Sequence, residues 1–242
     1  MERRYNRVLI KISGEAMFGA GSSGFDLDVV SNTCQNIKNV IDAGIGVSLV
    51  VGGGNFVRGR DWNDNEMVRP ETVDAMGMLS TVINGILIRD VLQSKGVPAQ
   101  MVSNLPLPFD VENNNSFTIR RIVQNGQVVI FVGGIGIPYF STDTVSVVGA
   151  LMSSCDVILK ATQTDGVYDR DPKIHRDAVH LPEVTYADAI SQRLGFMDET
   201  AILLASKKGI PIYVFSHREP NCLLMALKHE IRLSVVKSKQ AT

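Results

Sequence analysis

The sequence has few cysteines, no excess of charge of either sign and no long apolar run, and each absence excludes a class of protein. The three cysteines, Cys34, Cys155 and Cys222, are an odd number and lie far apart, so a disulfide framework is not expected. The 24 basic and 25 acidic residues give a formal net charge of −1, which favours neither nucleic acid nor an anionic membrane as a partner. Any anion that this chain binds must therefore be held by a local arrangement of groups.

Signals for export, membrane insertion and zinc binding are also missing. The four histidines show no spacing typical of zinc ligands. Residues 1–7 are rich in charge and lead directly into an apolar segment, which argues against a signal peptide. The most apolar stretch, residues 128–140, is interrupted by glycines and is too short to span a bilayer. These features predict a soluble, cytoplasmic protein.

The chain does contain a regular alternation of apolar runs and helical patterns. Strands are expected at residues 7–13, 47–51, 99–103, 127–132, 157–161 and 211–215. Helices are expected at residues 26–44, 70–95, 117–124, 142–153, 186–194, 198–207 and 221–229. This alternation is typical of a mainly parallel sheet covered by helices on both faces. We therefore predict an α/β fold, a three-layer αβα sandwich with a mainly parallel central sheet, in a single domain over residues 1–242.

The expected helix at residues 70–95 is apolar on more than one side. Its apolar residues include Met76, Leu79, Ile83, Ile86 and Val91, which do not fit on a single stripe. Two interpretations stay open: a central helix buried in a large core, or a helix that forms part of a subunit interface.

Glycines cluster where three of the predicted strands end. Open α/β sheets bind ligands at the carboxyl ends of their strands, and glycine lets backbone N–H groups approach an anion closely. Three such loops, each ahead of an expected helix, favour a phosphate-binding surface. The glycines are Gly14, Gly52, Gly53, Gly54, Gly133, Gly134 and Gly136.

Two common nucleotide-binding motifs do not account for these glycines. The chain contains no Gly-Lys step, which excludes the GxxxxGK[ST] phosphate loop. The segment 19–24 matches GxGxxG formally, but it begins several residues after the first strand. A dinucleotide site also requires an acid at the end of the second strand, where this chain has glycines. Dinucleotide binding is therefore the less favoured interpretation.

Charged residues beside the glycine loops have the chemistry that phosphoryl transfer needs, which is positioning and charge stabilisation. Lys11 lies within an apolar strand and either reaches a phosphate at the strand end or extends its ammonium to solvent. Arg58 follows Gly54 by four residues and is either a phosphate fork or an ordinary surface arginine. Asp143 either caps the helix that starts there or orients lysines or Mg²⁺. Tyr168, in a polar loop, is suited to flank a nucleotide base.

In this order, these segments resemble the amino-acid-kinase superfamily and specifically the bacterial UMP kinases. The resemblance covers nearly the whole chain. Its matching segments are Lys-Ile-Ser-Gly-Glu-Ala at 11–16, Gly-Gly-Gly-Asn-Phe-Val-Arg-Gly at 52–59, Asp-Ala-Met-Gly-Met at 74–78 with Asn-Gly at 84–85, Tyr-Phe-Ser-Thr-Asp at 139–143, Lys-Ala-Thr-x-x-Asp-Gly-Val-Tyr at 160–168 and Phe-Met-Asp at 196–198.

The resemblance implies transfer of the γ-phosphoryl group of ATP to UMP in pyrimidine nucleotide synthesis, with Mg²⁺ carried by ATP and no metal held by the protein alone. It implies that the N-terminal half carries mainly the UMP and phosphate sites, and the C-terminal half mainly the ATP site. Lys11, Arg58, Asp143 and Lys160 would be catalytic. ATP would contact Lys11, Ile12, Ser13, Gly14, Gly54, Arg58, Thr162, Tyr168 and Asp171. UMP would contact Gly53, Asp74, Ile135, Gly136, Ile137, Pro138, Tyr139, Phe140, Ser141 and Thr142.

The resemblance also implies a homohexamer that GTP activates and UTP inhibits. Part of the GTP site would lie at Gly19, Ala20, Gly21, Ser22, Ser23 and Gly24. The chain departs from the family pattern at Ile135 and Ile137, where the family usually has threonine and asparagine facing the uracil. Isoleucine side chains neither donate nor accept hydrogen bonds, so backbone groups would have to recognise the base. Two rival functions remain: a related kinase acting on another small acid, and a nucleotide-binding regulatory protein without turnover.

Overall fold

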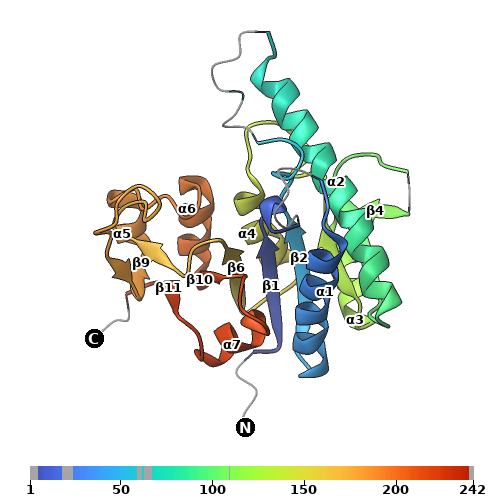
Figure 1. Ribbon diagram of the computed structural model, residues 1–242. Helices are drawn as coiled ribbons and strands as arrows, with labels where there is room; N and C mark the ends of the chain where they lie inside the picture. Colours follow the sequence, from blue (N-terminus) through green and yellow to red (C-terminus); the bar gives the residue numbers. More distant parts are fainter. Residues whose placement is uncertain (1–4, 18–23, 59–61, 63–66, 109, 240–242) are drawn as a thin grey trace.

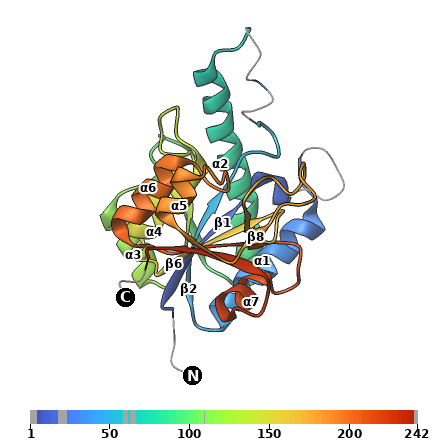
Figure 2. The ribbon, with the colours of Figure 1, turned by 90° about the vertical axis from the view of Figure 1, so that its left-hand side faces the viewer.

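The computed structural model describes residues 5–17, 24–58, 62, 67–108 and 110–239. Within these ranges, nine strands form one sheet in the order β4-β3-β5-β2-β1-β6-β10-β11-β9, with helices on both faces (Figures 1 and 2). The strands are β1 (Arg7–Ile12), β2 (Gly46–Val51), β3 (Ala99–Ser103), β4 (Val111–Asn113), β5 (Val128–Phe131), β6 (Val157–Thr162), β9 (Glu183–Thr185), β10 (Ile212–Ser216) and β11 (Leu233–Lys237). All pairs are parallel except β10 with β11. The predicted mainly parallel sheet is confirmed.

Two sets of helices cover the sheet, each over its own apolar core. One face packs against α1 (Leu27–Asp42), α2 (Pro70–Ser94) and α7 (Cys222–Lys228). The other packs against α3 (Ser116–Gln124), α4 (Thr142–Met152), α5 (Tyr186–Ser191) and α6 (Glu199–Lys208). Because side chains alternate along a strand, Ile10 of β1 enters the first core and its neighbour Leu9 enters the second. The three-layer sandwich predicted from the sequence is therefore confirmed.

Local signals explain where most elements begin and end. Asp26 caps α1 by accepting hydrogen bonds from the N–H groups of Asp28 and Val29. Pro70 occupies the first turn of α2, where its missing N–H costs nothing. Gly209 ends α6 in the left-handed conformation, with φ of 68°. The predicted helices and strands are all present, with ends displaced by up to a few residues.

The sequence patterns missed the short elements. These are β4, β9 and β11 of the main sheet, the hairpin of β7 (Val167–Tyr168) with β8 (His180–Leu181), and the 3₁₀ helix η1 (Gly14–Met17). The hairpin strands and β4 have only two or three residues each, which is too few for an alternating pattern to be recognised.

Helix α2 is partly buried and partly exposed, and its N-terminal end extends beyond the sheet (Figure 1). Val82, Ile88 and Leu92 are in the core, whereas the side chains of Leu79 and Ile83 are 51% and 46% exposed. By length and composition alone this helix could cross a membrane, but its packing against the sheet is that of a core helix. Both interpretations of its apolar surface therefore keep some support: one side is core, and another is open to a partner.

Candidate active site

Two lysines occupy equivalent positions on neighbouring central strands. Lys11 of β1 is the direct partner of Lys160 of β6 in the parallel register. Both residues alternate with apolar neighbours that face α1, α2 and α7, so both side chains face the α4 side of the sheet. They are only 8% and 5% exposed. Lysine is rarely buried without a partner, so this pair requires an anion nearby.

Asp143 supplies that anion from the first turn of α4. Its Oδ2 accepts a hydrogen bond from Lys160 Nζ at 2.7 Å, and its Oδ1 forms an ion pair with Lys11 Nζ at 3.0 Å. The helix cap is the neighbouring Ser141, which accepts from the N–H of Asp143. Asp143 is therefore the group that holds the two lysines, and the capping interpretation belongs to Ser141 instead.

Burial and charge act against each other on these three groups. Burial alone would raise the pKa of Asp143, but the charges of Lys11 and Lys160 outweigh burial and hold that pKa well below its usual range. Burial lowers the pKa of Lys160 to about 8, although Asp143 opposes the shift. At neutral pH the triangle of Lys11, Asp143 and Lys160 thus carries a net positive charge at the strand ends, which suits a transferring phosphoryl group.

The lowered pKa of Lys160 predicts a loss of catalytic efficiency at alkaline pH. The ammonium is present below its pKa and is lost as the pH rises through about 8. Because kcat/KM reports ionisations of the free enzyme, its profile should fall above pH 8. The substitution Lys160→Arg keeps the charge at high pH and should remove this alkaline limb. A wild-type profile that stays flat to about pH 9.5 would show that the charge of Lys160 plays no part.

The glycine loops meet because their residues have no side chains. A Cβ atom on Gly14 would overlap the backbone N of Gly54, and one on Gly53 would lie 2.6 Å from the carbonyl oxygen of Gly77. These glycines permit close approach of two loops, whereas Gly133, Gly134 and Gly136 adopt positive φ. The loops that follow β1 and β2 therefore lie against each other at the strand ends.

Two buried asparagines hold the second glycine loop in place. Asn84 of α2 donates to the carbonyl oxygen of Gly52 at 2.6 Å, and it exchanges amide hydrogen bonds with Asn55. Asn55 also donates to the carbonyl oxygen of Gly24. Since Asn84 is fully buried, this network rigidly joins α2, the glycine loop and the start of the α1 segment.

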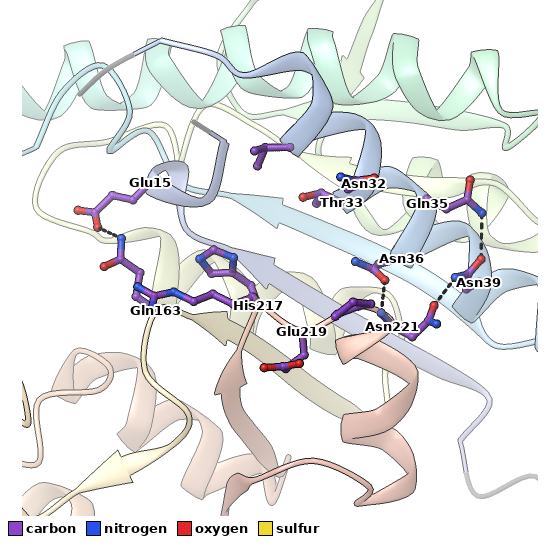
Figure 3. Close-up of a pocket in the computed structure, with 13 residues that line it drawn as sticks. Glu15, Asn32, Thr33, Gln35, Asn36, Asn39, Gln163, His217, Glu219 and Asn221 are labelled. Carbon is purple, nitrogen blue, oxygen red and sulfur yellow. Dashed lines mark hydrogen bonds between the residues drawn. The ribbon is translucent and has the colours of Figure 1, made fainter. Parts of the chain in front are cut away.

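Arg58 lies next to the first glycine loop and has acidic company. Its Nε donates to the carbonyl oxygen of Gly54 at 3.0 Å and lies 3.3 Å from Glu15 Oε1. Gln163 donates to the other oxygen of Glu15 (Figure 3). The structure therefore places Arg58 between the two phosphate-loop candidates, as expected from the sequence.

A cleft of about 220 Å³ lies beside the triangle. Of the residues predicted to contact UMP, it is lined by Gly53, Asp74, Ile137, Phe140, Ser141 and Thr142, together with Gly134 and Met78. Ile135 instead packs against the core under α3 to α6. Gly136, Pro138 and Tyr139 do not line the cleft, and the N–H of Tyr139 donates to Asp74 Oδ2 at 2.8 Å. We refer to this space as the acceptor cleft.

A second cleft, of about 660 Å³, lies at the ends of β6 and β10 and is called the donor cleft here. Tyr168 lines it, with its hydroxyl donating to Asp165 at 2.6 Å. Asp171 borders a neighbouring hollow with Tyr168, and Thr162 bonds within its own loop to Thr164. Of the predicted effector segment, residues 19–23 lie outside the described residues, and Gly24 bonds to the carbonyl oxygen of Asn55.

Sequence reasoning missed several side chains that organise the site. Glu15, Asn55 and Gln163 have no motif of their own, and their partners are distant in the chain. Asp198 caps α6 and also accepts from Ser141 and Thr144 of α4, which ties the ends of two helices together. Its Asp-Glu-Thr context signals a helix cap and nothing more.

The donor set of the described residues does not form a metal site by itself. No group of three or more His, Cys, Asp or Glu side chains gathers among them. Asp143, the carboxylate closest to the lysines, already has both oxygens engaged by ammonium groups. A divalent cation fits this site only when it arrives on a nucleotide.

Taken together, a parallel α/β sheet without a Walker loop, paired lysines on an aspartate and glycine loops facing two clefts define a phosphoryl-transferase of the non-P-loop kinase class. The comparisons with known proteins agree. The model of the amino acid kinase family matches residues 6–216, and the chain belongs to this family.

Similar proteins are named consistently. The uridylate kinase of Psychrobacter cryohalolentis is 40% identical over 227 residues, which is 94% of each chain. That of a Sulfurovum species is 40% identical over 235 residues, covering 96% of this chain and 99% of the relative. The solved UMP kinases of Ureaplasma parvum and Bacillus anthracis each superpose with a TM-score of 0.90 at 32% identity. They cover 98% and 99% of this chain, and 100% and 99% of their own.

Proposed function

We propose that this protein is a uridylate kinase that transfers the γ-phosphoryl group of ATP to UMP, giving ADP and UDP. The observation that carries the proposal is the buried triangle of Lys11, Asp143 and Lys160 between the two clefts. Asp143 directly follows Thr142 of the acceptor cleft. Lys160 comes three residues before Gln163 of the donor cleft. A phosphoryl group passing between the clefts crosses this positive charge.

The roles of the residues follow from their positions. Lys11 and Arg58 neutralise charge on the transferring group, and Asp143 keeps the lysines oriented. Mg²⁺ arrives on ATP and supplies further charge neutralisation on its phosphates. Asp74 faces the ribose of UMP from the acceptor cleft, and Tyr168 lies beside the adenosine of ATP. The mechanism is direct transfer, with the protein positioning both substrates rather than forming a covalent intermediate.

We extend the proposal to assembly and regulation, as the family resemblance implies. The protein works in the cytoplasm as a homohexamer, activated by GTP and inhibited by UTP. Leu79 and Ile83 on the exposed side of α2 are suited to a subunit contact. Light scattering after size exclusion should give six times the 26.4 kDa chain mass. A strict monomer at micromolar concentration would remove the assembly from the proposal.

The acceptor base is tested by ADP release from Mg·ATP with UMP, CMP, dTMP or AMP. We expect UMP to give the highest kcat/KM, since backbone groups of the loop after β5 can recognise uracil beside Ile137. The apolar side chain should limit the preference over CMP to about 10- to 100-fold, because one base contact contributes about 1–3 kcal/mol. Higher turnover with another monophosphate would reassign the substrate, and silence with all four would favour a binding protein.

A further inference from the structure

Three polar contacts run in series from Arg58 to the edge of the donor cleft, and the function proposed above gives them no role. Arg58 Nε lies 3.3 Å from Glu15 Oε1. Gln163 Nε2 donates to Glu15 Oε2 at 3.0 Å, as Figure 3 shows. Lys173 Nζ donates to Gln163 Oε1 at 3.1 Å. The series joins the loop after β1 to the loop after β6, at a sequence separation of 148 residues between Glu15 and Gln163.

The partners fix how each group in the series is oriented. A carboxylate only accepts hydrogen bonds and an ammonium only donates them. Gln163 therefore has its NH₂ toward Glu15 and its oxygen toward Lys173. Both oxygens of Glu15 are engaged, so its carboxylate cannot rotate freely. Contacts through Nε set the plane of the Arg58 guanidinium, and that plane decides how the group can bind phosphate oxygens in a fork.

The series is sheltered enough to matter. The side chains of Arg58 and Glu15 are 30% and 23% exposed, less than an ordinary surface pair that solvent screens. Gln163 lines the donor cleft and also a cleft of about 620 Å³ beside α1. A nucleotide in the donor cleft thus contacts the same amide that holds Glu15.

We propose that Glu15 and Gln163 are positioning residues for phosphoryl transfer, which orient Arg58 and connect it to the donor cleft. The inference rests on the proposed kinase function and adds two residues that act through Arg58. The polarity of the Glu15–Gln163 bond is its distinguishing feature, because exchanging the two side chains restores the bond in the opposite direction. In the exchanged pair, the amide at position 15 would donate to the carboxylate at position 163 and still present an oxygen to Arg58. That carboxylate would still accept from Lys173.

The test is a double-mutant cycle of Glu15→Gln, Gln163→Glu and the two combined, with full kinetics for both substrates. Each single substitution breaks the bond: Glu15→Gln places two amides together, and Gln163→Glu places two carboxylates together. We expect each to lower kcat about 10-fold with KM for UMP nearly unchanged, since a misaligned group costs rate rather than acceptor binding. The double variant should recover to within about threefold of the wild type, a strong positive coupling.

Gln35→Glu is the matched control, because it adds the same charge to the opposite wall of the 620 Å³ cleft without contacting Glu15. It should keep wild-type kinetics. Thermal unfolding checks that each variant folds. Should the single variants not fold, Lys173→Met on the exposed loop decides instead, with an expected fall in kcat of about threefold.

The outcomes separate this inference from the proposed function. A wild-type protein without UMP-dependent turnover would overturn the kinase assignment itself. An active wild type whose single variants match it, or whose double variant shows the product of the two single losses, would overturn the positioning role alone. If the single variants cannot be tested, an unchanged kcat for Lys173→Met would also overturn it.

Discussion

The substitution Lys11→Ala should lower kcat by roughly 10³-fold while the protein remains folded. The side chain is 8% exposed and is paired with Asp143, and removing one preorganised positive group from a transferring charge costs about 10²–10³ in rate. Its loss leaves Asp143 paired with Lys160 at 2.7 Å, so no buried charge is left alone. Steady-state ADP release with saturating Mg·ATP and UMP measures the effect.

The matched control is Lys38→Ala, which removes an exposed lysine paired with Asp42 on α1. Exposed pairs of this kind contribute little, so its kcat should equal that of the wild type. If Lys11→Ala kept a tenth or more of the wild-type rate, Lys11 would have no direct part in stabilising the transferring group.

The second large effect is expected for Asp143→Asn, on stability as well as on rate. This change leaves two buried ammonium groups without their shared counter-charge, and breaking such a pair costs about 3–5 kcal/mol in the free energy of unfolding. For a chain of this size that corresponds to a melting temperature lowered by about 10 °C. We expect kcat to fall at least about 10²-fold, because Lys11 loses the group that orients it.

The pH dependence of stability gives this prediction a sign. Without Asp143, the pKa of Lys160 falls further below its value of about 8, so the unfolded state binds more protons than the folded state over a wider range. Stability then rises with pH in that range, and the difference in unfolding free energy between variant and wild type should narrow as the pH approaches 8. A constant difference would contradict the account of the triangle.

Asp188→Asn serves as the control for the helix position of Asp143. Asp188 also lies in the first turn of a helix, α5, but it is exposed and bonds to Thr185. Its effect on unfolding should stay below about 1 kcal/mol. A similar loss in both variants would assign the effect to the helix dipole rather than to the buried lysines.

The fold could be predicted from the sequence because its signals are local. Apolar runs, caps such as Asp26 and stop signals such as Gly209 lie within the elements that they define. The strand β11 was missed because its alternation is weak and its buried Ser234 replaces an apolar residue. Ser234 is there for a non-local reason: it bonds to Val167 and Leu181 of the small hairpin.

The site was predictable only in part, because its geometry depends on strand pairing. Lys11 was recognisable from its position before Ser13 and Gly14, but its neighbour Lys160 lies on a strand that comes much later in the chain. No local pattern indicates that register. Likewise, the sequence treats Ile135 and Ile137 alike, whereas the turn after β5 directs the first into the core and the second into the acceptor cleft.

The central claim is that the triangle of lysines and aspartate moves a phosphoryl group directly between two nucleotides. Mixing ATP labelled in its γ-phosphate with UMP, Mg²⁺ and the protein, and separating the products, tests this most directly. We predict that the label appears in the β-phosphate of UDP, in proportion to the ADP formed, and that Lys11→Ala abolishes it. Label recovered only in inorganic phosphate, or in ATP left unchanged while both nucleotides are bound, would contradict the account.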